Sequence, residues 1–316
     1  MKFSIDYNIK PLANTLNMND SMLAVGSCFA ENMAAKMQEN GFNIMLNPNG
    51  IVFNPHSIFS HLQDYVGNKN LTEEELVLHD GLWHSMQHHG SFSSADKAKL
   101  IANVNTQIAQ AHNQLKQADW LFITLGSAWV YEYLPTQKKV TNNHKLSADL
   151  FNKKLLSIDE LYNQFETVWQ SIKQINPTIK MLWSVSPVRY VRDGLYENNI
   201  SKSILHLLVH QIVNTNPTNC FYFPAYEIVI DELRDYRFYK EDLVHPNELA
   251  INYVWQKFTA TCFDKNSIDY LNDFQKYNML INHKPLHTDS VSYQKYKEQC
   301  AHLRDYINNK YTKNID

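Results

Sequence analysis

The chain has 316 residues, of which 44% are hydrophobic and 19% are charged, and its formal net charge is -3. Such a chain is long enough for one large α/β domain with a substantial core. The nearly balanced charge gives no general basic surface for nucleic acid, and no apolar run approaches the ~20 residues of a membrane span. We therefore expect neither a nucleic-acid nor a membrane partner.

The amino-terminal segment and the cysteines indicate a cytoplasmic protein. The longest apolar run near the amino terminus is two residues, too short for the core of a signal peptide. The four cysteines (Cys28, Cys220, Cys262 and Cys300) are scattered, without CxxC or zinc-type spacing. Scattered thiols are typical of a reducing compartment. The sequence thus predicts a cytoplasmic location with neither a disulfide framework nor a bound metal.

Short apolar strands alternate with amphipathic helices along the chain. In chain order the predicted elements are strand 21–25, helix 28–40, strand 42–46, a long loop region 47–94, helix 96–117, strand 119–125, a helix from Ser157 toward Ile175, strand 179–185, helix 199–214, strand 220–223, a helix just after His245, and a polar, helical tail from about residue 266.

Several local signals support these boundaries. Gly41 is suited to end the first helix, and Ser157 with Glu160 forms the S-x-x-E pattern of a helix capping box. Pro246 is suited to the first turn of the helix after His245. Residues 47–94 are rich in Asn, Pro, Gly and His, which favours long structured loops.

The alternation predicts a parallel sheet covered by helices on both faces. We expect a three-layer, flavodoxin-like α/β/α sandwich with about five parallel strands over residues 1–265. Residues 266–316 would form a helical extension packed on the same domain. Ligands of such folds bind at the carboxyl ends of the strands. This edge would gather Ser27, the loop from Asn47 and three later stretches (Gly126 to Trp129, Ser186 to Tyr190, and the segment before His245).

Ser27 and His245 are the residue types needed for nucleophilic catalysis. Ser27 follows the first strand and starts a helix, where backbone N–H groups favour negative charge. Asp242 and His245 are three residues apart before a later helix, so both side chains can point to one place. A serine needs such a base, and a carboxylate can orient the imidazole. Alternatively, Ser27 is only a helix cap, and Asp242 with His245 is an ordinary surface pair.

A glycine-preceded serine near the start and a D-x-x-H near the end resemble the SGNH, or GDSL-like, hydrolases. Gly26 to Ala30 reads GSCFA, so the chain is identified as a member of the GSCFA-domain family. The resemblance covers roughly residues 20–260 and rests on several segments in order: NPNGIVFNP at 47–55, LGSAWVY at 125–131, VTNNHK at 140–145, SPVRYVRDG at 186–194 and FPAYEIVIDELRDYRFYKEDLVHP at 223–246.

The resemblance implies a serine hydrolase fold and a set of roles. Ser27 would be the nucleophile, His245 the base and Asp242 the orienting acid. The oxyanion would be bound by the backbone N–H groups of Ser27 and Gly50 and by one Asn side chain.

The chain departs from the superfamily at that Asn, because its Gly126-Ser-Ala-Trp129 stretch has none after the third strand. Asn142, on a nearby loop, is a candidate for this place, with Asn49 and Asn54 as other candidates. A missing oxyanion donor costs about 10²–10³ in rate.

Other residues have more than one interpretation. The proposed substrate contacts are Asn49, Asn54, Trp83, His89, Gly126, Trp129 and Arg189. Arg189 could bind an anion or a sugar hydroxyl, or pair with a local acid. The histidines at 84, 88 and 89 could bind metal, line a substrate loop or pack ordinarily, and no carboxylate pattern completes a metal site. Cys28 could replace Ser27 as nucleophile, but a buried, inert thiol is more usual.

These observations predict an esterase that removes a small acyl group, such as an O-acetyl, from a carbohydrate or another small ester, without a cofactor. An O-acyltransferase would use the same acyl-enzyme, and a binding protein could retain the fold without catalysis. The α/β-hydrolase nucleophile elbow, GxGxxG and the Walker A motif are absent from the sequence.

Overall fold

The computed structural model describes residues 5–282 and 291–313. Its centre is a five-stranded sheet in the order β10-β9-β5-β1-β2, with all neighbouring strands parallel. The strands are β1 (Ser21–Gly26), β2 (Asn43–Leu46), β5 (Trp120–Leu125), β9 (Lys180–Val185) and β10 (Cys220–Tyr222). This order is that of a flavodoxin-like sheet, so the predicted architecture is confirmed.

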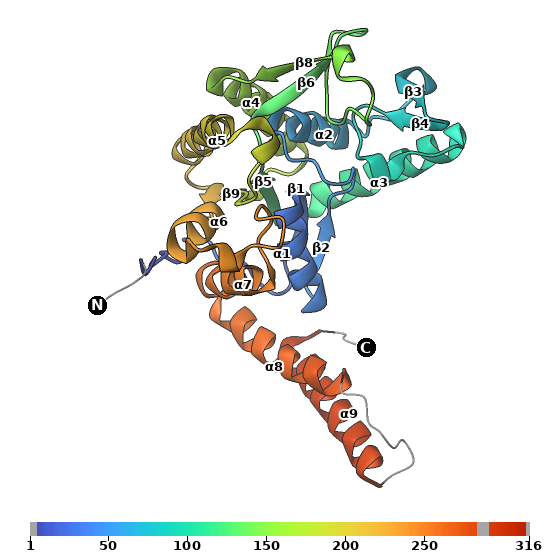
Figure 1. Ribbon diagram of the computed structural model, residues 1–316. Coiled ribbons are helices and arrows are strands. Elements are labelled where there is room, and N and C mark those ends of the chain that lie inside the picture. Colours follow the sequence, from blue (N-terminus) through green and yellow to red (C-terminus); the bar gives the residue numbers. More distant parts are fainter. Residues whose placement is uncertain (1–4, 283–290, 314–316) are drawn as a thin grey trace.

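Helices cover both faces of the sheet (Figure 1). Alternate residues of β1 show this: Leu23 and Val25 belong to one hydrophobic cluster, and Met22 and Ala24 to the other. The first cluster includes α2 (Pro55–Gly67), α3 (Lys97–Gln117), α4 (Ile158–Ile175) and α5 (Leu195–Thr215). The second includes α1 (Cys28–Glu39), α6 (Ala225–Glu227) and α7 (Glu248–Cys262).

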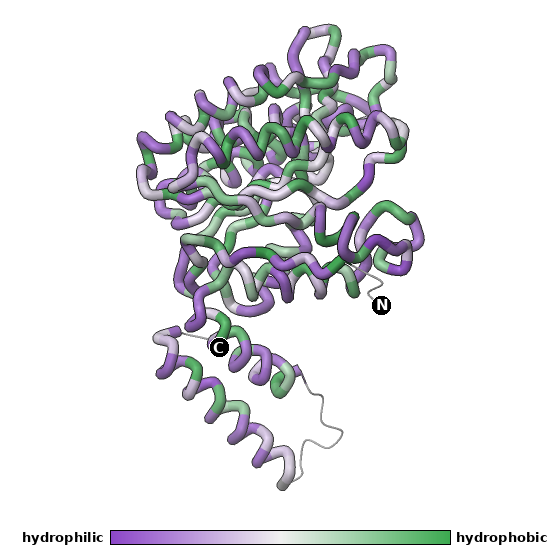
Figure 2. The backbone as a smooth tube through the Cα atoms, turned by 90° about the vertical axis from the view of Figure 1, so that its left-hand side faces the viewer, coloured by the Kyte–Doolittle hydropathy of each residue, from purple (hydrophilic) through white to green (hydrophobic). Residues whose placement is uncertain are grey.

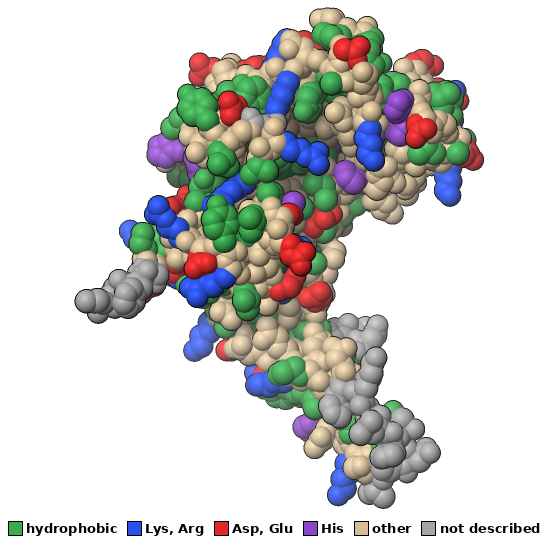
Figure 3. Space-filling view, viewed as in Figure 1, with side chains coloured by type: hydrophobic (Ala, Val, Ile, Leu, Met, Phe, Trp, Pro, Cys, Tyr) green, Lys and Arg blue, Asp and Glu red, His purple; other side chains and the backbone are tan. Residues whose placement is uncertain are grey.

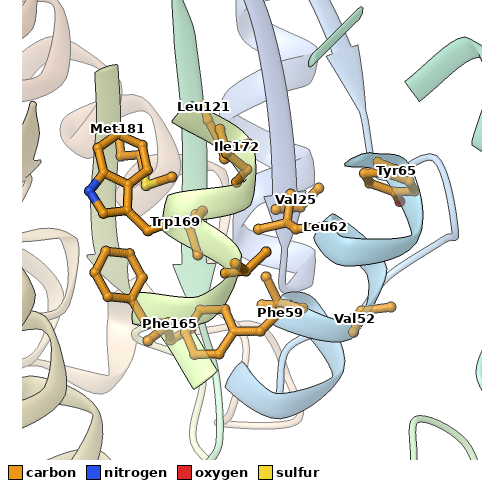
Figure 4. Packing of buried hydrophobic residues seen from close by; sticks show 14 of the residues in the cluster. Val25, Val52, Phe59, Leu62, Tyr65, Leu121, Phe165, Trp169, Ile172 and Met181 are labelled. Atoms are coloured by element: carbon orange, nitrogen blue, oxygen red, sulfur yellow. The ribbon is translucent and has the colours of Figure 1, made fainter. Parts of the chain in front are cut away.

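Aromatic and aliphatic side chains fill the space between the sheet and α2–α5. Phe59 of α2 and Phe165 of α4 have ring centroids 6.1 Å apart, and Trp183 of β9 meets both rings edge-on. Figure 4 shows Trp169 beside Met181 of β9 with Phe165 near them, and Leu62 of α2 beside Val25 of β1. Figure 2 shows hydrophobic segments in the central strands and alternating hydrophobic and hydrophilic turns in the covering helices.

Local signals set most element ends. Gly41 follows α1 with φ 75°, a left-handed conformation that glycine adopts without steric conflict. Ser157 Oγ accepts the N–H of Glu160 at 3.2 Å, which confirms Ser157 as the cap of α4, whereas the Glu160 side chain binds Lys139 and does not complete the capping box. The expectation for Pro246 was wrong, because Asn247 caps α7 instead and accepts the N–H of Ala250 at 3.2 Å.

The interpretation of residues 47–94 as loops was wrong for two elements. Helix α2 lies within this range, as does the hairpin of β3 (Leu76–His79) and β4 (Leu82–Ser85). Asn54 and Pro55 start α2 as N-cap and first residue, but among many Asn and Pro residues they resemble a turn. Sequence also missed the small sheet of β6 (Trp129–Tyr133), β7 (Lys138–Val140) and β8 (Phe151–Leu155).

Short helical turns complete the connections; they are Glu73–Glu75, Gly90–Phe92, Ala148–Leu150, Val191–Asp193, Ile228–Leu233 and Tyr236–Phe238. Helices α8 (Lys265–Ile281) and α9 (Val291–Tyr311) form a hairpin that extends away from the sheet (Figure 1). Phe42 joins α8 to the body, with its ring 5.9 Å from that of Tyr270. Among residues 5–282 and 291–313, none of the helices combines the length and apolar character needed to cross a bilayer.

Candidate active site

Ser27 lies between the end of β1 and the start of α1. It is the N-cap residue of α1 by backbone position, yet its side chain makes no capping hydrogen bond. The residue is fully buried, and its Oγ has no hydrogen-bond partner. A buried hydroxyl without a partner is unfavourable, so the interpretation of Ser27 as a simple helix cap is not supported.

Position 26 requires glycine, because β1 and β5 approach each other closely there. A Cβ at this position would lie 2.5 Å from the carbonyl oxygen of Thr124 on β5, and φ is 150°. The Gly26 N–H donates to Asn47 Oδ1 at 2.9 Å, and the Val52 N–H donates to the Gly26 carbonyl. The loop after β2 therefore fixes the backbone that carries Ser27.

Asp242 and His245 form a tight pair on the loop before α7. His245 Nδ1 is 2.7 Å from Asp242 Oδ2, while Asp242 Oδ1 accepts the backbone N–H groups of Val244 and His245. Hydrogen bonds from the His245 and Val244 backbones, followed by the imidazole, lower the pKa of Asp242 to about 2. The carboxylate is thus ionised near neutral pH and orients the imidazole.

The three side chains are not joined in one relay. Ser27 Oγ is buried and unpartnered, so it has no hydrogen bond to His245. The side chains of His245 and Asp242 are 42% and 48% exposed. Their loop has its own internal support, because the Lys240 N–H donates to the His245 carbonyl and Leu243 has φ 59°. Figure 1 shows the segment between α6 and α7 passing in front of α1.

Both predicted backbone oxyanion donors already have acceptors. The Ser27 N–H donates to the Thr124 carbonyl at 3.2 Å, and the Gly50 N–H donates to the Asn47 carbonyl at 2.8 Å. Asn49 differs from them, because its side chain is 1% exposed and neither its Nδ2 nor its Oδ1 has a partner. Both polar atoms of Asn49 are thus unpartnered, whereas on Asn47 of the same loop only Nδ2 is.

Comparison with known proteins assigns the chain to a family. The GSCFA family model matches residues 21–258. The chain belongs to the GSCFA family. A search of the curated proteins finds no match. Among solved structures, one of a candidate platelet activating factor from Streptococcus pneumonia has 10% identity and a TM-score of 0.41, covering 78% of this chain and 85% of that chain.

Two further predicted residues of this GSCFA protein have structural roles. Asn54 Oδ1 accepts the Ser57 N–H at the start of α2, and its Nδ2 donates to the carbonyls of Ser127 and Trp129. Gly126 has no room for a side chain, since a Cβ there would lie 2.4 Å from the Tyr190 hydroxyl. Asn54 is therefore committed to joining α2 to the loop after β5, without a free amide for an oxyanion.

Trp83 belongs to β4 of the β3–β4 hairpin, and Asn142 and His89 lie near the end of that strand. Asn142 Oδ1 accepts the His144 N–H, and its own N–H donates to the Met86 carbonyl. Trp83 lies under the Lys97 ammonium, 4.4 Å from the ring centroid. The His89 N–H donates to the Asn49 carbonyl at 3.2 Å, so His89 connects this hairpin to the loop after β2.

Trp129 and Arg189 line the loops after β5 and β9. The Trp129 ring lies 4.9 Å from the Lys153 ammonium, and the Arg189 guanidinium is 4.8 Å from the Tyr239 ring and 5.5 Å from that of Tyr236. Arg189 thereby contacts the segment that leads to Asp242. Figure 3 shows Lys and Arg side chains around a hollow between the upper and lower parts of this face.

The alternatives of a cysteine nucleophile and a metal site gain no support. Burial, followed by the nearby Glu31, raises the pKa of the Cys28 thiol, opposite to an activated thiolate. His84 and His88 are hydrogen-bonded to Ser93 and Ser85. Within the described part of the chain, no three His, Cys, Asp or Glu residues gather as metal ligands.

A buried polar cluster on α5 was not predicted from the sequence. Asn198, Ser201 and Lys202 are each at most 4% exposed and contact the loops after β5 and β9. Their spacing of three and four residues places them on one helix face, which Leu205 continues. The sequence signal for this cluster was the presence of polar residues on the face of a predicted helix that its apolar residues mark as buried.

Proposed function

We propose that this GSCFA protein is a serine ester hydrolase that removes a small acyl group, such as an O-acetyl, from a carbohydrate-like ester. The observation that carries the proposal is the presence of both an unpartnered, buried Ser27 Oγ and an oriented Asp242–His245 pair. Ser27 has no other hydrogen bond to satisfy, and the imidazole has its Nδ1 fixed by a carboxylate. These are the parts that a serine nucleophile and its base require.

In the proposed reaction, Ser27 Oγ attacks the ester carbonyl carbon as its proton passes to His245 Nε2. The tetrahedral intermediate then collapses, the bond to the leaving alkoxide breaks, and His245 returns the proton to that oxygen. Asp242 stabilises the imidazolium between these steps. Water then attacks the acyl carbonyl carbon as its proton passes to His245 Nε2. The bond to Ser27 Oγ breaks, His245 returns the proton to Oγ, and the acyl group leaves as a carboxylic acid.

This reaction requires a rearrangement at the loop that carries the base. His245 must approach Ser27, and the hydrogen bonds of the Asp242 and His245 side chains lie within the 240–245 loop, so the pair would move with that loop as a unit. Because the N–H groups of Ser27 and Gly50 have acceptors, we assign the Asn49 amide as the side-chain donor to the oxyanion. Its buried, unpartnered Nδ2 supports this assignment over Asn142 and Asn54.

The occupied N–H groups favour the competing function of a non-catalytic binding protein, so the test must separate the two. Hydrolysis of p-nitrophenyl acetate is measured for wild type, Ser27→Ala and Ser57→Ala. Ser57 is a matched control, since it is also buried with an unpartnered Oγ near the start of a helix. We expect Ser27→Ala to lose at least about 10³-fold in kcat, with Ser57→Ala near wild type.

A fluorophosphonate probe followed by peptide mass spectrometry gives a second readout. The expected result is covalent labelling of Ser27 in wild type and its loss in His245→Gln. Equal ester hydrolysis by wild type and Ser27→Ala, or no labelling of Ser27, would overturn the esterase proposal. Product formation only after addition of an acceptor alcohol would instead identify an acyltransferase.

A further inference from the structure

Helix α5 presents a polar face to the carboxyl edge of the sheet. Asn198, Ser201 and Lys202 lie near its amino-terminal end, and all three are buried. The face continues into the apolar core with Leu205 and Leu208. Burial of polar groups is unfavourable without partners, so their contacts define what this part of the helix does.

All three residues bind the backbone of the two loops that border the candidate site. Asn198 Oδ1 accepts the Tyr190 N–H at 3.0 Å. Ser201 Oγ accepts the Ala128 N–H at 2.8 Å. Lys202 Nζ donates to the carbonyl oxygens of Gly126 and Ser186, each at 2.7 Å. Helix α5 thereby holds the loop after β5 and the loop after β9 in one arrangement (Figure 1).

Lys202 is the unusual member of the three. It is 2% exposed, and no carboxylate among the described residues forms an ion pair with it. Burial lowers the pKa of Lys202 to about 7. The rings of Tyr190 and Tyr226 lie 5.2 Å and 5.9 Å from the ammonium and interact favourably with its charge. A buried ammonium without a carboxylate is costly, and core packing alone would favour an apolar side chain here.

The two carbonyls that Lys202 binds lie close to Ser27 along the sheet. Gly126 is two residues after Thr124, whose carbonyl accepts the Ser27 N–H. Thr124 Oγ1 is 2.9 Å from Ser184 Oγ on β9, two residues before Ser186. The ammonium thus binds the loop after β5, which lacks the superfamily Asn, and the loop after β9.

We propose that Lys202 is a positioning residue for the ester chemistry at Ser27. Its ammonium fixes the ends of β5 and β9 through Gly126 and Ser186, and it places a buried positive charge at the end of the strand whose Thr124 carbonyl accepts the Ser27 N–H. This inference rests on the proposed esterase function. A displacement of these strand ends would move the Ser27 backbone relative to the reacting carbonyl, and about 1 Å of misplacement can cost ~10²-fold in rate.

The groups that face Lys202 come from several elements: Cys28 of α1, Tyr190 of the loop after β9, His206 of α5 itself and Tyr226 of α6. Burial raises the pKa of Cys28 and of Tyr226, and burial with the Lys202 charge lowers the pKa of His206. These three groups therefore remain neutral just above pH 7. A decrease in kcat as pH rises through 7 to 8 is the change expected from loss of the Lys202 charge.

The test compares Lys202→Met and Lys202→Gln with Asn176→Ala. Asn176 is a matched control because it is also buried and donates from one side-chain nitrogen to two backbone carbonyls, those of Leu115 and Ala118. These carbonyls precede β5, at the opposite edge of the sheet. With p-nitrophenyl acetate, Lys202→Met should lose at least about tenfold in kcat at unchanged KM, while Asn176→Ala keeps its kcat. Lys202→Gln retains N–H donors and should lack the decrease in kcat above pH 7.

Amide hydrogen exchange provides a readout that does not depend on activity. Peptides covering 126–130 and 186–191 should exchange faster in Lys202→Met and be unchanged in Asn176→Ala. Unchanged exchange in these peptides, or equal loss of kcat in both variants, would overturn the inference. If wild type is inactive on esters but the exchange difference is present, the esterase proposal fails and the loop-positioning role of Lys202 remains.

Discussion

Acidification to pH 5 is expected to destabilise the protein by about 4 kcal/mol through two buried histidines, His61 and His88. Their rings are stacked with centroids 5.5 Å apart, and the two residues are 4% and 3% exposed. His61 Nε2 is 2.6 Å from the Gln87 carbonyl, and His88 Nδ1 is 2.7 Å from Ser85 Oγ. Burial lowers the pKa of His61 to about 4 and that of His88 to about 3.

The direction and size of the effect follow from proton linkage. Both histidines have lower pKa values in the folded protein than the unfolded value of about 6.5, so the unfolded chain binds more protons below that pH. Their stabilising contribution is complete above pH 6.5 and is lost as pH falls. From pH 6.5 to 5 the loss is about 1.5 pH units at 1.36 kcal/mol each, or about 2 kcal/mol per histidine. Total stabilities of 5–15 kcal/mol make about 4 kcal/mol readily measurable.

Urea unfolding at pH 7.5 and pH 5.0 measures this loss. His88→Gln removes one of the two groups and should reduce the difference between the two pH values by about 2 kcal/mol. His210→Gln, at an exposed position on α5, is the control and should retain the wild-type difference. If His88→Gln shows the same pH dependence as wild type, the assignment of acid sensitivity to the stacked pair is wrong.

Two further substitutions test the framework around Ser27. Gly26→Ala would place a Cβ 2.5 Å from the Thr124 carbonyl, so we expect about 1–3 kcal/mol lower stability in urea unfolding. Gly67→Ala is its control, because no atom lies within 4 Å of the added Cβ, and a loss equal to that of Gly26→Ala would contradict the steric argument. Asn54→Ala removes the cap of α2 and two bonds to the loop after β5, and should lower stability by about 2–3 kcal/mol. A decrease of less than ~0.5 kcal/mol in the free energy of unfolding would show that water replaces these hydrogen bonds.

The position of Ser27 was accessible from sequence because its determinants are local. An apolar run, a glycine and an amphipathic helix place it at a strand end, and Asp242 and His245 pair within four consecutive residues. The family resemblance supplied the roles that these residues would have. The same local reasoning failed for α2, because Asn54 and Pro55 resemble a turn unless the helix that follows is recognised.

The sequence alone determined the alternation of strands and helices, because side-chain periodicity and local turn chemistry depend on near neighbours. This alternation predicted the parallel sheet and the edge of the sheet where Ser27 lies. Hydrogen bonds between distant segments depended on the tertiary structure. In the folded protein the Ser27 N–H donates to the Thr124 carbonyl, and the Asn49 side chain has no partner. Lys202 donates to the carbonyls of Gly126 and Ser186. These partners are 76 and 16 residues from Lys202 along the chain, so only the packing of α5 against the ends of β5 and β9 brings them together.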